Sequence, residues 1–168
     1  MELISQELNT RLDSIVTFAF FLNRQLDRSM SLLSVKFKLL KTSALLHKKF
    51  AHFFPTFADF LSEYQDSRGM LTVYGETPKA DFDANSHIEL FEMFLEEFIK
   101  YQDMIEDVID ACIAEKDHMT KAFLDGYLLK LNPYIQSAEN VLDVAKMYGV
   151  DPLGMQLFDS EIEHCLTV

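Results

Sequence analysis

The residues of this sequence that could do chemistry are carboxylates and histidines at spacings that suit a metal ion. Glu115 and His118 form a Glu-x-x-His pair, with which helical bundles supply a carboxylate and an imidazole to a metal. Glu97 lies among apolar neighbours, so it offers an inward carboxylate, with Asp59 or Glu63 as a second. These residues predict a metal site inside one subunit. The alternative is that Glu115 and His118 lie in a turn, where their side chains need not share a face.

Other kinds of chemistry find no support in the sequence. It contains no Ser-His-Asp set, no Gly-rich phosphate loop and no Cys-x-x-Cys. Its two cysteines, Cys112 and Cys165, have neither disulfide-framework nor metal-knuckle spacing, which favours a reducing compartment. The N-terminus lacks the basic start of a signal peptide, and the longest apolar run, 15–22, is too short to span a bilayer. We therefore expect a soluble, cytoplasmic protein with no membrane partner.

Charge is unevenly distributed along the chain. The formal net charge is −12, yet seven basic residues against Asp27 give residues 24–49 a balance of +6, which leaves −18 for the rest. The basic residues are Arg24, Arg28, Lys36, Lys38, Lys41, Lys48 and Lys49. The strongly acidic remainder of the chain repels phosphate, so we do not expect direct nucleic-acid binding. The interpretation we favour is a basic face paired with acidic helices of the same or a neighbouring subunit.

Two long amphipathic helices must position the acidic residues of the C-terminal half. Between Ser86 and Gly149, apolar residues recur at three- and four-residue steps, first over 88–112 and then over 123–148. Thr120 is the expected N-cap of the second helix and Gly149 its C-terminal stop. Only about five residues separate the two helices, so they should be antiparallel neighbours. Their apolar faces need two more helices, which predicts a four-helix bundle.

The N-terminal half supplies those helices, but its helix break is ambiguous. Residues 3–54 contain no Gly or Pro, and the break could fall near 27–31 or near 42–43. Residues 76–85 form a polar linker long enough to run the length of a helix. A long crossover between the second and third helices is the connection of the ferritin-like bundle. The sequence thus predicts an all-α fold of this kind.

A single domain is expected over residues 1–168. We predict an N-terminal helical extension over 1–19, a bundle over about 20–148, and a C-terminal tail over 149–168 with at most one short helix. The predicted helices are 3–17, 20–45, 47–74, 86–115 and 119–148.

Four segments resemble Dps-type mini-ferritins of the ferritin-like superfamily. Residues 21–26 (FLNRQL) are similar to the opening of that family's first bundle helix, and 46–50 (LHKKF) to its Leu-His-x-Lys-Phe segment. Residues 71–78 (LTVYGETP) resemble the close of its second helix, and 114–124 the turn into its fourth. The resemblance covers about residues 20–148. It implies a four-helix subunit, a hollow dodecamer, and oxidation and storage of iron in stress protection.

The resemblance also implies a ligand set, in which two histidines of one subunit meet an Asp and a Glu of another. In register with 46–50, the retained ligands are His47 and Asp66, with Glu63 as a further carboxylate, while Ser62 replaces the family's Asp. The other histidine position falls near Val35 or Lys41, and a second register puts Phe57 there. We therefore expect a degenerate iron site with weak ferroxidase activity at most. The alternative function is a metal-free bundle with a structural or interaction role.

Two expectations concern assembly. The turn residues Glu115, Asp117, His118 and Asp125 occupy the region that resembles the pore lining of ferritin-like cages, where an acidic ring would draw cations. Their alternative role is that of solvated turn residues. Phe18, Phe20, Phe53 and Phe54 exceed what one four-helix core needs, which predicts a homo-oligomer, a dodecamer if the assembly is Dps-like.

Overall fold

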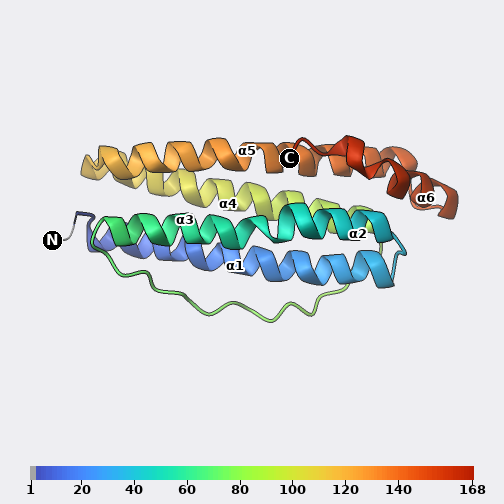
Figure 1. The fold of residues 1–168 in the computed structure, drawn as a ribbon, viewed down its shortest axis with the longest axis horizontal. Coiled ribbons are helices and arrows are strands. Elements are labelled where there is room, and N and C mark those ends of the chain that lie inside the picture. Colours follow the sequence, from blue (N-terminus) through green and yellow to red (C-terminus); the bar gives the residue numbers. More distant parts are fainter. Residues whose placement is uncertain (1–2) are drawn as a thin grey trace.

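The structure, a computed structural model, describes residues 3–168 and is built from helices (Figure 1). The helices are α1 (Gln6–Val35), α2 (Leu40–Leu46), the π-helical segment η1 (His47–Ala51), α3 (Phe53–Ser67), α4 (His87–Glu115), α5 (His118–Tyr148), α6 (Pro152–Glu161) and the 3-10 segment η2 (Ile162–Cys165). No strand occurs in this part of the chain, which confirms the all-α prediction.

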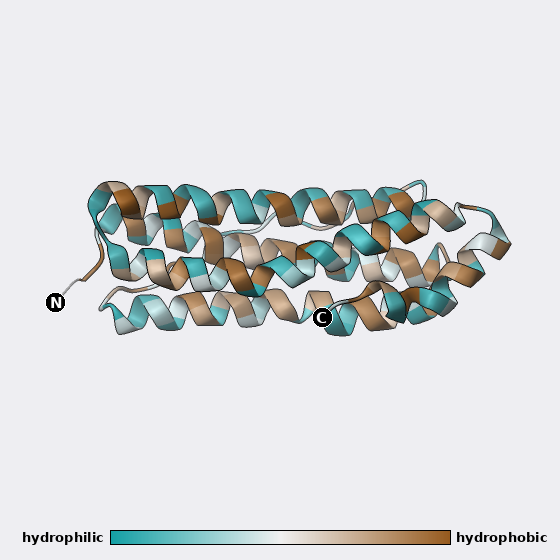
Figure 2. Cartoon of the chain, turned by 90° about the horizontal axis from the view of Figure 1, so that it is seen from above, coloured by the Kyte–Doolittle hydropathy of each residue, from teal (hydrophilic) through white to brown (hydrophobic). Residues whose placement is uncertain are grey.

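Two antiparallel helix pairs make up the bundle. α1 packs against the continuous α2–η1–α3 unit, α4 packs against α5, and α1 also contacts α4. Residues 68–86 connect α3 to α4 without a helix and run back along α1 (Figure 1). Hydrophobic and hydrophilic residues alternate in bands along the helices, as expected for amphipathic segments (Figure 2). This arrangement confirms the predicted four-helix bundle with a long crossover between its second and third helices.

Helix boundaries in the N-terminal half differ from those predicted. α1 starts at Gln6, where the Ser5 hydroxyl accepts the Leu8 amide hydrogen, so described residues of the predicted extension belong to the first bundle helix. Residues 1–2 lie outside the described part. The break falls at residues 36–39, between the two predicted positions, and Lys38 there takes a positive φ of 60°. A lysine rarely adopts this conformation, so residue type gave no signal for the turn.

The C-terminal segment is an integral part of the fold rather than a loose tail. α6 and η2 pack against α5 and α2, and Phe158, Ile162 and Cys165 are buried. A Cβ atom on Gly154 would lie 2.0 Å from the Tyr148 carbonyl oxygen, so only glycine permits this close approach. None of the helices in residues 3–168 is long and apolar enough to cross a membrane.

Aromatic rings fill the middle of the bundle. Phe54, Phe57, Phe98 and Tyr101 are fully buried, and the Phe54 and Phe98 ring centroids lie 5.0 Å apart. The Tyr127 hydroxyl donates to the Phe57 carbonyl oxygen at 2.9 Å and lies 2.7 Å from the Tyr101 hydroxyl. Burial raises the pKa of both tyrosines, so both stay neutral.

The expectation that four aromatic residues exceed the needs of one core is wrong. Phe54 is fully buried, and Phe18, Phe20 and Phe53 are partly buried against the core. These rings pack within one subunit, so they do not support an oligomer.

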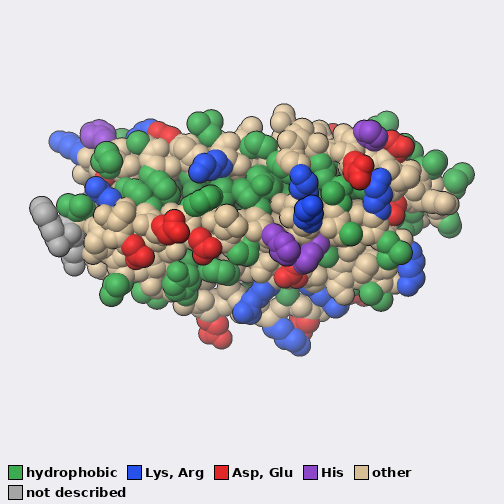
Figure 3. All heavy atoms as spheres, in the orientation of Figure 1, with side chains coloured by type: hydrophobic (Ala, Val, Ile, Leu, Met, Phe, Trp, Pro, Cys, Tyr) green, Lys and Arg blue, Asp and Glu red, His purple; other side chains and the backbone are tan. Residues whose placement is uncertain are grey.

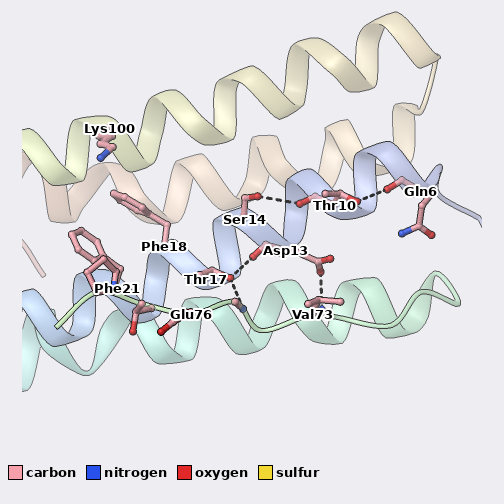
Figure 4. Close-up of a pocket in the computed structure, with 13 residues that line it drawn as sticks. Gln6, Thr10, Asp13, Ser14, Thr17, Phe18, Phe21, Val73, Glu76 and Lys100 are labelled. Atoms are coloured by element: carbon pink, nitrogen blue, oxygen red, sulfur yellow. Dashed lines mark hydrogen bonds between the residues drawn. The ribbon is translucent and has the colours of Figure 1, made fainter.

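The crossover is attached to α1 by a regular series of hydrogen bonds. The Asn9 side chain donates to the Leu71 carbonyl, the Val73 amide donates to Asp13, and the Gly75 amide donates to the Thr17 hydroxyl, at 3.1, 3.0 and 2.9 Å. Four residues of helix rise about 6.0 Å and two residues of extended chain about 6.6 Å, so the two repeats nearly match. Figure 4 shows the second and third of these bonds.

Candidate functional site

A histidine pair lies where the second bundle helix widens into η1. The His47 and His52 ring centroids are 4.5 Å apart, and Figure 3 shows histidine side chains together on the face of α2–α3. Five α-helical residues advance about 500°, which would point two such side chains about 140° apart. The wider π-helical turn instead brings residues five apart to the same face. The geometry of the pair therefore depends on η1.

Pro55 explains why the helix widens there. It has no amide hydrogen, so the carbonyl oxygen of Ala51, four residues earlier, has no donor within the helix, and the proline ring crowds it. Asn23 of α1 satisfies this carbonyl, because its side-chain amide donates to the Ala51 oxygen at 2.9 Å. The proline and the asparagine together stabilise the widened turn.

A carboxylate from α1 completes the cluster of His47, His52 and Asp27. The His47 Nε2 atom lies 3.4 Å from Asp27 Oδ1, and both side chains are about half exposed. Two imidazoles and a carboxylate are the donor types that suit ferrous iron. Even so, within residues 3–168 no three His, Cys, Asp or Glu side chains are placed to hold a metal ion as they stand. The cluster in one subunit is therefore at most part of a site.

The other predicted ligands of this site lie far away on the same helix. Glu63 and Asp66 are exposed near the end of α3, and Asp66 follows His47 by nineteen residues, about 28 Å along a helix. The structure of one subunit therefore does not bring His47 together with Glu63 or Asp66.

Charge changes sign along this same helical unit. Its N-terminal half carries Lys41, Lys48 and Lys49 with no acidic residue, and its C-terminal half carries Asp59, Glu63 and Asp66 with no basic one. The unit is therefore basic in its first half and acidic in its second half.

The alternative metal site inside one subunit is not assembled. Asp59 is exposed, and Glu97 lies at the edge of the bundle, where its carboxylate is 3.9 Å from the Lys100 ammonium. The bundle middle, where inward carboxylates would be needed, holds phenyl and phenol rings instead. The residues present therefore do not fit an iron pair inside the bundle.

The turn between α4 and α5 uses its acidic groups locally. Asp117, rather than Thr120, is the N-cap of α5 and accepts the Thr120 amide hydrogen at 3.0 Å. Asp125 pairs with Lys121 at 2.7 Å, while Glu115 and His118 are exposed. A pore lining formed by this turn stays a prediction.

Two features of possible ligands escaped the sequence analysis. His52 is not among the predicted ligands, although its five-residue spacing from His47 just before Pro55 is a usable signal. A second Glu-x-x-His pair, Glu161 and His164, lies at the end of α6 with its side chains 3.6 Å apart.

A groove of about 720 Å³ lies between α1 and the crossover (Figure 4). Phe18 and Phe21 line it, and the Lys100 ammonium lies 4.9 Å from the Phe18 ring centroid. Between its hydrogen bonds to α1 at Gly75 and Phe82, the crossover has an extended length of about 23 Å. The matching stretch of α1, from Thr17 to Arg28, rises about 16 Å. The extra chain length lies at one end of the groove, where Phe21, Thr77 and Pro78 line it.

Comparison with known protein families gives a match that covers most of the chain. A family model described as a ferritin-like domain matches residues 28–147, from the last part of α1 to the end of α5. No curated protein matches the chain.

Proposed function

Because this chain belongs to the ferritin-like domain family, we propose that it binds ferrous iron on the face formed by α2, η1 and α3, and that dissolved dioxygen slowly oxidises the bound iron, taking up its electrons. The observation that carries the proposal is the cluster of His47, His52 and Asp27, in which the widened helix brings two imidazoles together beside a carboxylate. The resemblance places a second histidine near Val35 or Lys41, where this chain has none. In our proposal His52 supplies it instead.

A second copy would complete the site. The sign change of charge along α2–α3 makes the face complementary to itself under a two-fold rotation, which supports an antiparallel homodimer. In that arrangement Glu63 and Asp66 of one copy approach His47 of the other. We propose this dimer as the building block of a homo-oligomer, a dodecamer if the assembly follows the Dps type.

Iron is the substrate, and the protein contributes ligands and orientation. His47 and His52 offer neutral imidazole nitrogens, and Asp27 and Asp66 offer negative charge that stabilises the ferric product. Ser62 stands where a carboxylate ligand would be expected, which removes both a ligand atom and a charge. We therefore expect weak binding and slow oxidation.

Aerobic addition of ferrous iron tests the proposal, with binding measured by calorimetry under argon and oxidation followed by ultraviolet absorbance. The variant His47→Ala/His52→Ala should bind iron at least tenfold more weakly than wild type, and Asp66→Ala should slow oxidation. The matched control is Asn132→Ala/Gln136→Ala, which removes two exposed polar side chains of α5 that are not ligand candidates and should bind as wild type does. Equal binding by all the proteins would refute the site, and uptake of hundreds of irons per assembly would point to storage.

The second candidate function is a metal-free bundle with a structural or interaction role. The observation that favours it is the aromatic filling of the bundle middle, which leaves no room for inward carboxylates. Wild-type protein that binds no ferrous iron yet forms a stable oligomer would select this candidate.

A further inference from the structure

His87 is a fully buried histidine at the start of α4, close to the bundle end that α6 covers. Its exposed fraction is 0 %, and neither ring nitrogen has a hydrogen-bond partner within the described chain. Buried polar groups normally have a partner, because leaving one without costs about 1–3 kcal/mol. This unsatisfied imidazole therefore calls for an explanation.

Three aromatic rings from three different segments surround it. Its ring centroid lies 6.4 Å from that of Phe37 in the α1–α2 corner, 5.9 Å from Phe91 of α4 and 5.6 Å from Phe158 of α6. Phe158 is the fully buried anchor of α6. The environment of His87 thus stays apolar only while α6 is docked.

Few polar contacts hold α6 in place. The Asp159 carboxylate accepts the Thr42 amide hydrogen at 2.7 Å and the Lys41 amide hydrogen at 3.2 Å, at the N-terminus of α2. The Lys41 ammonium donates to the Ser160 carbonyl at 2.9 Å. Releasing α6 together with η2 also breaks the hydrogen bonds of Thr167 with Ser137 and Pro133, and it exposes the aromatic cluster along with the buried Ile162 and Cys165.

No charge compensates a proton on His87. Within residues 3–168 no ionisable group bonds to the imidazole, and the charged groups on the elements packed around it pair elsewhere. The pairs are Lys36 with Asp83, Lys41 with Glu163, Asp159 with the α2 amides, Glu89 with Asn85, Glu92 with Lys146, and Glu161 with His164. His87 is also the first residue of α4, where the helix dipole disfavours a cation. The site is therefore built for the neutral ring.

We propose that protonation of His87 releases α6 and η2 from the end of the bundle, so that the chain carries an acid-sensitive opening. A charged imidazole cannot remain among three phenyl rings without water, and undocking Phe158 is the shortest route by which water reaches it. Release exposes Phe37 and Phe91 and frees the C-terminal segment.

The direction of the pH dependence follows from burial. Desolvation lowers the pKa of His87 below its ordinary value of 6.5, so the undocked state binds the proton more tightly than the docked state. Docking is therefore stable above pH 6.5 and weakens as the pH falls from 6.5 toward the lowered pKa. Over that window the ratio of undocked to docked protein should rise by up to tenfold per pH unit.

The two cysteines provide an internal measurement. Cys165 is buried in η2, whereas Cys112 is buried in α4, near the opposite end of the bundle, and burial raises the pKa of both thiols. Full-length protein is treated with N-ethylmaleimide between pH 7.5 and 5.5, and each site is quantified by mass spectrometry. Dividing the modification of Cys165 by that of Cys112 cancels most of the effect that pH has on the thiolate content of both. We expect this ratio to rise at least fivefold as the pH falls.

Variants separate His87 from the surrounding carboxylates. His87→Phe keeps an aromatic ring and cannot be protonated, so its ratio should stay flat, and His87→Gln should behave in the same way if the phenyl ring packs poorly. His164→Gln removes an exposed histidine and should retain the wild-type rise. Phe158→Ala should give a high ratio at every pH. A flat wild-type ratio, or an equal rise in both His87 variants, would overturn the proposal.

Discussion

The middle of the bundle and the η1 face both contain aromatic rings in contact, but the rings differ in burial and in hydrogen bonding. In the middle, Phe98 and Tyr101 of α4 interlock with Phe54 of α3, and the polar atoms bond to one another. At η1, His47 and His52 have ring contact but remain exposed, and their nitrogens lack a full set of partners. The first region is complete within one chain, and the second is not.

This difference favours the surface of the fold over its interior as the place for the proposed metal site. A bundle whose interior is filled by rings gains stability from packing and gives up the inward carboxylates that a metal pair requires. A widened turn on the outside can hold donors at little cost to the core. Three substitutions measure how far the two regions differ.

The largest effect should come from Phe98→Ala. Removing a fully buried phenyl ring leaves a cavity beside Phe50 and Phe54, so the free energy of unfolding should fall by about 3–5 kcal/mol in urea denaturation. The matched control is Phe60→Ala, whose ring is 39 % exposed and lies 4.5 Å from the Lys130 ammonium. We expect that control to lose about 1 kcal/mol. Equal losses would show that the middle is not specially packed.

Tyr127→Phe should have an intermediate effect. It removes the hydroxyl that donates to the Phe57 carbonyl and leaves the Tyr101 hydroxyl without its partner, at a cost of about 1–3 kcal/mol. Because burial raises the pKa of both tyrosines, the unfolded chain loses their protons first, and wild-type stability should fall as the pH rises above 10. Urea denaturation at pH 8 and pH 11 measures both effects. The same alkaline slope in Tyr127→Phe and wild type would contradict this account.

The smallest effect should come from charge reversal on the η1 face. Lys48→Glu/Lys49→Glu should weaken self-association about tenfold, or about 1.4 kcal/mol, with the unfolding of each chain nearly unchanged. Sedimentation at two salt concentrations measures the association. Adding Asp59→Lys/Glu63→Lys in the same chain should restore it, because both halves of the face then exchange sign. Association that ignores both pairs of substitutions would place the interface elsewhere.

Regular features of the sequence predicted most of the fold. Three- and four-residue spacing over 88–148 located α4 and α5, and Gly149 marked the end of α5. The corner at 36–39 was missed because Lys38, rather than glycine, carries its positive φ. α3 ends at Ser67 rather than near 74, since residues from Leu71 onward bond to α1 instead of continuing the helix.

The candidate site was only partly predictable. His47 came from a resemblance in sequence, but its neighbour His52 depends on a π-helical turn, and the sequence reading assumed α-helical spacing. Pro55 indicates that the carbonyl of Ala51, four residues earlier, lacks its helical donor. The donor that replaces it belongs to Asn23, twenty-eight positions from Ala51. Long-range contacts of this kind are not visible in local periodicity.

The spare length of the crossover between Gly75 and Phe82 has a consequence for engineering the chain. Within the described part of the chain no hydrogen bond joins this stretch to α1, whereas the bonds at Gly75 and Phe82 hold it on both sides. Insertions between Gly75 and Phe82 should be tolerated better than insertions between Leu71 and Gly75, where the crossover is hydrogen-bonded to α1. Exposed chain outside regular structure accepts added residues. The same point divides the sequence into two halves, α1 to α3 and α4 to η2, that meet through the core. Expressed as separate fragments cut at this stretch, the halves should reassemble, which would make the fold a source of split reporters.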